Sequence, residues 1–283
     1  MITVLESINL SSEYLKNKGI ESPRINAELL LAHILNCKRL NLYLSFEKPL
    51  TEEEIDKYRE LLKRRSKFEP LQYIIGKVEF YGIDFKVNPS VLIPRQETEI
   101  LVETIIGQYD KYDTLRILDI GTGSGNIAVS LAKNLDNSFI TALDISEDAL
   151  KTANENAILN SVNDRIEFIK IDILKEEFIR NEFDLVVSNP PYISIVEFET
   201  LCPELKEYEP KVALTDYNSG FHFYEIISTK SNHLLKPSGK LFFEVGKGQF
   251  SIVSEIMKKN NFQNIDVTKD YLNIERVISG EKI

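Results

Sequence analysis

The sequence predicts an α/β protein in which a small all-helical domain precedes a doubly wound, mostly parallel sheet of seven strands with an antiparallel terminal hairpin. Three observations support this fold class. Apolar residues recur at helical spacing up to about residue 75. After Pro94, apolar strand-like segments alternate with longer helical ones, the pattern of a parallel sheet covered by helices on both faces. The chain ends with two β-rich segments joined by a short turn.

Residues 1–75 carry helix start signals ahead of their apolar periods. Ser22 can cap a helix that has Pro23 at its first position. Thr51 and Glu54 have the spacing of a capping box, which predicts a second helix start. The buried stripe of the helix after Ser22 is expected to contain Ile25, Leu29 and Ala32. This region is therefore predicted to be a helical domain.

Residues 76–93 form a predicted β-hairpin linker. The segments VEFYG (78–82) and IDFKVN (83–88) are rich in strand-forming residues and lie close enough in sequence to pair with each other.

Residues 94–283 are expected to form the sheet domain. Its strands are predicted at 116–120, 140–145, 166–173, 184–189, 240–245, 264–270 and 274–280. Its principal helices are predicted at 126–135, 148–160, 221–236 and 249–260. Alternation of this kind places the carboxyl ends of the parallel strands along one edge of the sheet.

Charge and hydropathy exclude several classes of protein. The net charge of −10 repels a phosphate backbone, so we expect no stable binding of nucleic acid. Apolar runs are far shorter than a membrane span, and we expect no membrane association. The first residues do not resemble a targeting segment, which favours a cytoplasmic location. The basic run at 57–67 is interpreted as the solvated face of a helix.

Cysteine and histidine are too sparse and scattered for a metal site. Cys37 and Cys202 have no second ligand at a suitable spacing, and both are expected to be buried small apolar residues. We therefore expect neither a metal nor catalysis that depends on histidine.

A glycine-rich turn follows the first strand of the sheet domain. It consists of Gly121, Thr122, Gly123, Ser124 and Gly125. Its G-x-G-x-G spacing differs from the G-x-G-x-x-G of nicotinamide and flavin sites, and it lacks the Lys of a phosphate loop. Without side chains, the turn allows a ligand to approach the backbone. The sequence therefore predicts a cofactor site here.

Acidic residues at the ends of the next two strands complete the predicted cofactor site. Asp144 lies 21 residues after Gly123, close to the offset at which an acidic residue reaches ribose hydroxyls in such folds. Asp172 and Ile173 end the third strand, where they are well placed for an adenine amine and ring face. Together these residues predict a nucleoside-containing ligand.

The sequence Asn189-Pro190-Pro191-Tyr192 follows the fourth strand and is the most specific signal in the chain. The prolines lack N–H donors, so the Pro190 carbonyl and the Asn189 side-chain oxygen remain as neighbouring acceptors. Two acceptors suit a substrate NH₂ group, and they can aim its nitrogen lone pair and stabilise the positive charge that grows there. Tyr192 would provide an aromatic wall for a planar group. We therefore predict that Asn189 and Pro190 are catalytic residues that hold and activate a planar nitrogen nucleophile.

Longer segments resemble one family. The stretch 69–103 is similar to the linker region of the HemK-type peptide chain release factor glutamine methyltransferases, as are YEPKVAL at 208–214 and the tail at 274–280. With the glycine turn and Asn189–Tyr192, the resemblance covers nearly the whole chain. It implies the methyltransferase version of the Rossmann-like sheet, in which a terminal antiparallel hairpin is usual. Two positions depart from the pattern: Gln96 replaces a common proline, and Ile173 replaces an aromatic residue of some members.

The resemblance also implies a substrate and a cofactor. Residues 121–125, Asp144, Ile173 and Asn189 would contact S-adenosylmethionine, and Asn189–Tyr192 would hold the target glutamine in the Gly-Gly-Gln loop of class I release factors. Residues 1–75 would grip the folded substrate, and we expect a monomer. Arg95, Thr98 and Glu99 are expected to line the same cleft.

Three other functions stay open from the sequence. A sibling enzyme could methylate a glutamine of a ribosomal protein, since its motifs look similar. Methylation of an adenine amine in nucleic acid is disfavoured by the net negative charge and by the absence of a target-recognition domain. A non-catalytic cofactor-binding assembly factor would be expected to have a degraded Asn-Pro-Pro-Tyr sequence, and here it is intact.

Overall fold

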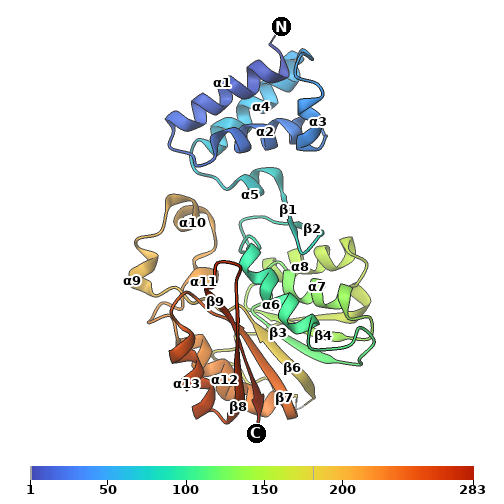
Figure 1. The fold of residues 1–283 in the computed structure, drawn as a ribbon, viewed down its shortest axis with the longest axis vertical. Helices are drawn as coiled ribbons and strands as arrows, with labels where there is room; N and C mark the ends of the chain where they lie inside the picture. The colour runs from blue at the N-terminus through green and yellow to red at the C-terminus, as the bar shows by residue number, and fades with distance from the viewer. Residues whose placement is uncertain (1, 181) are drawn as a thin grey trace. The chain divides into compact units, whose positions relative to one another are not determined.

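The computed structural model describes residues 2–180 and 182–283, which divide into two compact units (Figure 1). The helical unit comprises the residues up to Gly76 together with Pro203–Tyr208. The sheet unit comprises Lys77–Cys202 and Glu209–Ile283. The predicted boundaries at residues 75 and 93 did not include the short segment at 203–208, which joins the helical unit from far along the chain.

The helical unit packs its helices around one apolar core. Its helices are α1 (Val4–Asn17), α2 (Pro23–Ile34), α3 (Arg39–Tyr43), α4 (Glu52–Arg65), α5 (Leu71–Ile75) and α10 (Pro203–Tyr208). The predicted capping box at the start of α4 is confirmed: the Thr51 N–H donates to the Glu54 carboxylate at 2.7 Å, and the Glu54 N–H donates to the Thr51 hydroxyl at 3.2 Å.

The prediction for α2 is wrong in two details. Ser22 has a left-handed backbone (φ 47°) and makes no side-chain cap, and Ile25 is 42% exposed. Of the other two predicted residues, Ala32 is buried and Leu29 is half-buried, and the buried face also contains Ala27, Leu30 and Leu31. It also includes Glu28, which is buried because it accepts hydrogen bonds from three donors. These donors are Arg24 at 2.9 Å, Arg39 at 2.7 Å and Tyr43 at 2.9 Å. Apolar periodicity alone cannot find a face that includes a paired carboxylate.

Arg65 corrects the interpretation of residues 57–67 as a solvated face. Its side chain is buried and donates to the Asn26 side chain at 2.7 Å, the Glu69 carbonyl at 2.8 Å and the Glu204 carboxylate at 2.8 Å. Arg65 therefore links α4 and α2 to α10, and it helps to hold residues 203–208 in the helical unit.

The sheet unit contains a mostly parallel seven-stranded sheet, which confirms the predicted fold class. Its strands are β3 (Arg116–Ile120), β4 (Phe139–Asp144), β5 (Ile166–Lys170), β6 (Phe183–Ser188), β7 (Leu235–Glu244), β8 (Phe262–Lys269) and β9 (Glu275–Lys282). The order is β5-β4-β3-β6-β7-β9-β8, with β9 antiparallel to both of its neighbours. The predicted linker hairpin is also present as β1 (Lys77–Phe80) and β2 (Ile83–Lys86).

Helices cover both faces of this sheet (Figure 1). One apolar core lies under α6 (Gln96–Ile106), α7 (Asn126–Asn134) and α8 (Glu147–Leu159), and the other lies under α12 (His222–Leu234) and α13 (Phe250–Lys259). The short elements η1 (Asn163–Arg165), α9 (Ile195–Phe198) and α11 (Lys211–Leu214) lie in connections. The polar motifs of the sequence follow the carboxyl ends of the parallel strands.

Arg65→Met should destabilise the helical unit, because it leaves Glu204 and Asn26 without their donor. Removing one partner of a buried pair costs several kcal/mol, and the partial exposure of Glu204 reduces this to roughly 2 to 4 kcal/mol. Hydrogen exchange should show faster exchange at 203–208 as well as in α4. Arg59→Met is the matched control, since Arg59 lies on the same helix with a 68% exposed side chain. Equal protection of 203–208 in both variants would contradict the assigned role of Arg65.

Candidate active site

The parallel register of β3 with its two neighbours brings the predicted site residues together. Ile120 lies opposite Leu143 of β4 and opposite Ser188 of β6. The residues that follow these three strands therefore meet at one edge of the sheet. A pocket of about 310 Å³ opens there, and the predicted site residues that line it are Gly121, Gly123, Asp144, Asp172, Ile173, Asn189, Pro190 and Pro191.

Two glycines give the pocket its backbone floor. The N–H groups of Gly121 and Thr122 both donate to the Leu143 carbonyl at 2.9 Å, which ties the turn to β4. Gly121 and Gly123 have positive φ angles, 77° and 55°, and a Cβ added at either position would meet no atom within 4 Å. The backbone is therefore open to a ligand at these two positions, as a cofactor cradle requires.

The other residues of the glycine turn stabilise its conformation and do not line the pocket. The Thr122 hydroxyl donates to the Asp119 carboxylate at 2.6 Å, and the Ser124 carbonyl accepts from the Asn156 side chain at 2.9 Å. At Gly125 a Cβ would lie 3.0 Å from the Cβ of Ala153, so α7 and α8 can pack closely only with glycine here.

Asp119 was missed in the sequence, although it stands in the same segment as the glycines. It is fully buried, and its Oδ1 has no hydrogen-bond partner within the part of the chain that the structure describes. Burial raises the pKa of Asp119 to about 7, and the nearby Asp144 charge adds to this effect while the Thr122 hydrogen bond opposes it. The turn is thus anchored to a carboxyl group that titrates near neutral pH.

Asp144 joins the glycine turn to the start of α8. One carboxylate oxygen accepts from the Gly123 N–H at 2.8 Å, and the other accepts from the Ser146 N–H at 2.8 Å. Burial raises the pKa of Asp144, and these N–H groups act against the rise. Each oxygen has a second lone pair, so the carboxylate can accept from a diol in the pocket while it keeps both backbone bonds.

The end of β5 provides a wall with polar and apolar parts. Asp172 accepts from the Leu174 N–H at 3.1 Å and pairs with Lys175 at 2.9 Å. Burial alone would raise the pKa of Asp172, but these partners outweigh it and hold the pKa below the usual value. Ile173 is buried and lines the pocket, as does Ile145. An apolar ring with an amino group fits this combination.

Asn189 presents its two amide ends to different surroundings. Its Nδ2 group donates to the Thr98 hydroxyl at 3.1 Å. No hydrogen bond reaches its Oδ1 from residues 2–180 or 182–283. Because Asn189 lines the pocket with Pro190, its oxygen remains an acceptor for a substrate N–H.

Tyr192 does not line the pocket, in contrast to the aromatic wall predicted from the sequence. Its ring packs against the core under α12, and burial raises the pKa of its hydroxyl to about 12. Its carbonyl accepts from the Gln249 side chain at 2.9 Å. At Gly220 an added Cβ would lie 2.5 Å from this carbonyl, so only glycine leaves room for the turn.

The other three residues of the resemblance hold neighbouring segments and do not line the pocket. Arg95 pairs with the buried Glu209, Thr98 accepts from Asn189, and the Glu99 carboxylate accepts from the Tyr81 N–H at 2.8 Å. The expectation that they form its lining is therefore wrong, although Thr98 accepts a hydrogen bond from Asn189, which does line it. Glu209 was quoted within YEPKVAL, but nothing in its local sequence indicates that it is buried.

The cysteines and acidic residues do not form a metal centre in the described ranges. No group of three or more His, Cys, Asp or Glu side chains is arranged there to hold a metal ion. Cys37 is half-buried and Cys202 is exposed, so the prediction that both are buried is wrong. Cys202 lies in the connection that leads into α10, outside either sheet core.

No helix of the described residues combines the length and hydropathy needed to cross a bilayer.

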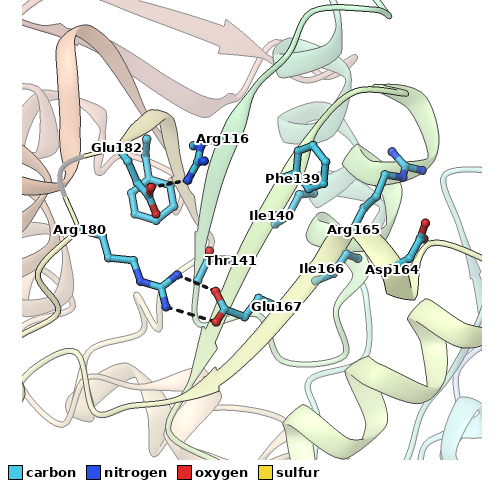
Figure 2. Close-up of a pocket in the computed structure, with 11 residues that line it drawn as sticks. Arg116, Phe139, Ile140, Thr141, Asp164, Arg165, Ile166, Glu167, Arg180 and Glu182 are labelled. Carbon is cyan, nitrogen blue, oxygen red and sulfur yellow. Dashed lines mark hydrogen bonds and ion pairs between the residues drawn. The ribbon is translucent and has the colours of Figure 1, made fainter.

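A second cavity, of about 350 Å³, lies at the opposite, amino-terminal edge of the sheet (Figure 2). Four of its charged residues form two pairs: Arg180 donates to the Glu167 carboxylate at 2.6 and 3.3 Å, and Arg116 pairs with Glu182. A third guanidinium, that of Arg165, donates to the Leu135 and Asp136 carbonyls. The guanidinium groups of Arg180 and Arg116 both point at carboxylates in Figure 2. Because these charged groups are paired with each other, we assign no binding or catalytic role to this cavity.

Asp119→Asn tests the anchor of the glycine turn through its pH dependence. The folded pKa lies above the usual 3.8, so the folded state binds the proton more tightly and stability is lost as the pH rises toward 7. The amide keeps an acceptor for Thr122 without a buried charge. The free energy of unfolding in urea should therefore rise by about 1 to 3 kcal/mol at pH 8, with a smaller gain at pH 5.

Asp148→Asn is the control, because Asp148 has a 74% exposed side chain and should change stability little at either pH. A loss of stability at pH 8 in the Asp119 variant would show that this charge is not a cost to the fold.

Two sequence families match the chain. One is described as the PrmC N-terminal domain and matches residues 6–76, and the other is described as a methyltransferase domain and matches residues 111–275. Solved structures of similar fold include the following two. A methyltransferase from Pyrococcus furiosus has a TM-score of 0.51 at 18% identity, over 72% of this chain and 90% of that one. The hMettl16 catalytic domain, in complex with an RNA hairpin, has a TM-score of 0.55 at 16% identity, over 81% and 82%.

Relatives of known function are more similar in sequence. The release factor glutamine methyltransferase of Fusobacterium nucleatum is 44% identical over 279 residues, which covers 98% of this chain and 78% of that protein. The protein of the same name from Chlorobaculum tepidum is 39% identical over 285 residues and covers 98% and 96%. With both the helical and the sheet regions matched, the chain belongs to the release factor glutamine methyltransferase family.

Proposed function

We propose that this enzyme transfers a methyl group from S-adenosylmethionine to the side-chain amide nitrogen of the glutamine in the Gly-Gly-Gln motif of class I release factors. The observation that carries the proposal is the Asn189 amide: its nitrogen donates to Thr98, and the residue lines the pocket beside Pro190. Membership of the family supports the substrate. The proposed substrate acts in translation, which supports a cytoplasmic enzyme, and we propose that it works as a monomer.

The residues of the pocket fit the proposed cofactor. Gly121 and Gly123 expose backbone, Asp144 has lone pairs for a ribose diol, and Asp172 and Ile173 suit an adenine. When bound, S-adenosylmethionine supplies an electrophilic methyl group on a sulfonium. Thr122, Ser124 and Gly125 would act indirectly, by keeping the turn in shape.

Asn189 and Pro190 would orient the nucleophile. An amide nitrogen is a poor nucleophile because its lone pair is delocalised, and acceptors for both of its hydrogens hold the lone pair in one direction. The same oxygens stabilise the positive charge that develops on nitrogen. The alkylated nitrogen is acidic and can lose its proton late, so no strong base is required beside it.

The helical unit is our candidate for recognition of the folded substrate. A Gly-Gly-Gln loop is short, and the pocket alone offers little to distinguish one protein from another. The match of residues 6–76 to a domain of this family supports the assignment of residues 1–75 to substrate recognition. A peptide that carries only the loop should therefore be a much poorer substrate than the intact release factor.

The direct test supplies methyl-labelled cofactor with intact release factors, a Gly-Gly-Gln peptide, ribosomal proteins and nucleic acid. Mass spectrometry then maps the labelled atom. Label on the glutamine amide of a release factor is the expected result. Label on a ribosomal protein glutamine or on adenine, with none on release factors, would replace our proposal with one of those activities.

Asp144→Ala should weaken cofactor binding at least tenfold. The variant loses an acceptor for the ribose and also the two backbone bonds that join Gly123 to Ser146. Charge-assisted hydrogen bonds are worth roughly 1.5 to 3 kcal/mol each, which sets the scale of the effect. Calorimetry would measure the affinity, with Asp148→Ala as an exposed control from the same segment. Unchanged affinity in the Asp144 variant would reject the ribose assignment.

Asn189→Ala should lower kcat by roughly 10²-fold or more, with a smaller effect on binding. The substrate amide loses one acceptor in the pocket, and its nitrogen can rotate away from the methyl group. Asn189→Asp keeps an acceptor of similar shape, so partial activity is expected. Single-turnover kinetics with saturating cofactor and release factor separate the chemical step from binding. A wild-type rate in the alanine variant would refute the proposed role.

A further inference from the structure

Glu244 is a buried carboxyl group beside the reaction site that lines no wall of the pocket. Ser188 of β6 lies opposite Phe243 of β7, so the next residues along these parallel strands, Asn189 and Glu244, are neighbours. Glu244 is 1% exposed, and its Oε2 has no hydrogen-bond partner in the described part of the chain. A buried carboxyl group that is only partly satisfied is a cost to the fold, which calls for a functional explanation.

Thr98 connects this carboxyl group to the reactive amide. It is buried, and its hydroxyl accepts from the Asn189 Nδ2 group at 3.1 Å. The Thr98 hydroxyl and the Asn189 amide both act on the Glu244 carboxyl group, and each lowers its pKa. A hydroxyl has one proton to donate. While that proton is given to Glu244, the Thr98 oxygen can only accept from Asn189, and the chain of donors runs in one direction.

We propose that Glu244 is a positioning residue that acts on its neighbour Asn189, directly and through Thr98, to keep the Asn189 amide in one orientation, with its oxygen toward the substrate and its NH₂ group away from it. The inference rests on the proposed function and adds a residue to its mechanism. The two orientations of an asparagine amide have nearly the same shape, so packing alone cannot choose between them. An ionised Glu244 carboxylate favours one of the two orientations, because it only accepts hydrogen bonds.

A protonated Glu244, or a glutamine in its place, could donate to Thr98. The Thr98 hydroxyl would then donate its proton to Asn189, and Asn189 could accept it only through its side-chain oxygen. The amide would flip and present NH₂ to a substrate that also presents NH₂. Two donor groups that face each other cannot form a hydrogen bond. The reacting nitrogen would then have no acceptor on Asn189 to orient it.

The surroundings of Glu244 place this change in an accessible pH range. Burial raises its pKa to about 7, Thr98 and the Arg276 guanidinium oppose the rise, Glu97 adds to it, and Asn189 opposes it. The hydroxyls of Tyr192 and Tyr224 also face this region, and Tyr224 donates to the Glu244 carbonyl at 2.9 Å. The pKa of each tyrosine is raised, so neither titrates near pH 7.

The test compares the wild-type enzyme with Glu244→Gln in single-turnover methylation of an intact release factor. The wild-type rate should rise through a midpoint near pH 7. The variant should be roughly tenfold slower or more at pH 8, without that rise, while its cofactor affinity and melting temperature do not fall. Thr98→Val should reproduce the loss, and Thr98→Ser should recover most of it. Glu255→Gln is the control, because Glu255 is a carboxylate on α13 with a 63% exposed side chain, and its removal should keep both the rate and the rise.

A second readout does not depend on methylation. The side-chain NH₂ resonances of Asn189, assigned with an Asn189 variant, should shift with a midpoint near pH 7 in the wild type and not in Glu244→Gln. The positioning role would be overturned by an unaltered methylation rate in Glu244→Gln. It would also be overturned if the Asn189 resonances showed the same pH dependence in the wild type and in Glu244→Gln. If the wild-type enzyme fails to methylate any release factor, the proposed function fails instead, and the resonances still decide the inference.

Discussion

The parallel pairing of β3 with both β4 and β6 is the constraint on which the functional part of this protein depends. It aligns Ile120 with Leu143 and with Ser188, so three strands end at the same level. Each strand is then followed by a different chemical element: exposed backbone after β3, a carboxylate at the end of β4, and amide and carbonyl oxygens after β6. A slip in either register would separate the predicted cofactor site from the predicted substrate site.

Much of this arrangement could be predicted because its signals are local. Apolar periodicity gave the helices and strands, and the capping box at Thr51 needs only four residues. The glycine turn and Asn189–Tyr192 are continuous motifs whose chemistry can be inferred from composition and order. Their meeting in space followed from one general property, that parallel strands present their carboxyl ends together.

The remaining features depend on partners that are remote in sequence. Arg65 meets Glu204, 139 residues away, and Arg95 meets Glu209, 114 residues away. Charged residues are usually exposed, so the sequence predicts Arg65 in solvent and Arg95 in the pocket. Glu244 was missed for the same reason. Its segment is an ordinary buried strand, and only the register of β6 with β7 brings it to Asn189.

The excursion of residues 203–208 into the helical unit has a consequence for protein engineering. Because the chain enters that unit twice, the unit is not a removable N-terminal module. A shortened chain that begins at residue 77 would strip α10 of the partners that α4 supplies, including Arg65, and would leave an unsupported segment directly before Glu209. Exchange of the helical unit between relatives would therefore require two grafts, one at the start of the chain and one at 203–208, chosen from the same donor.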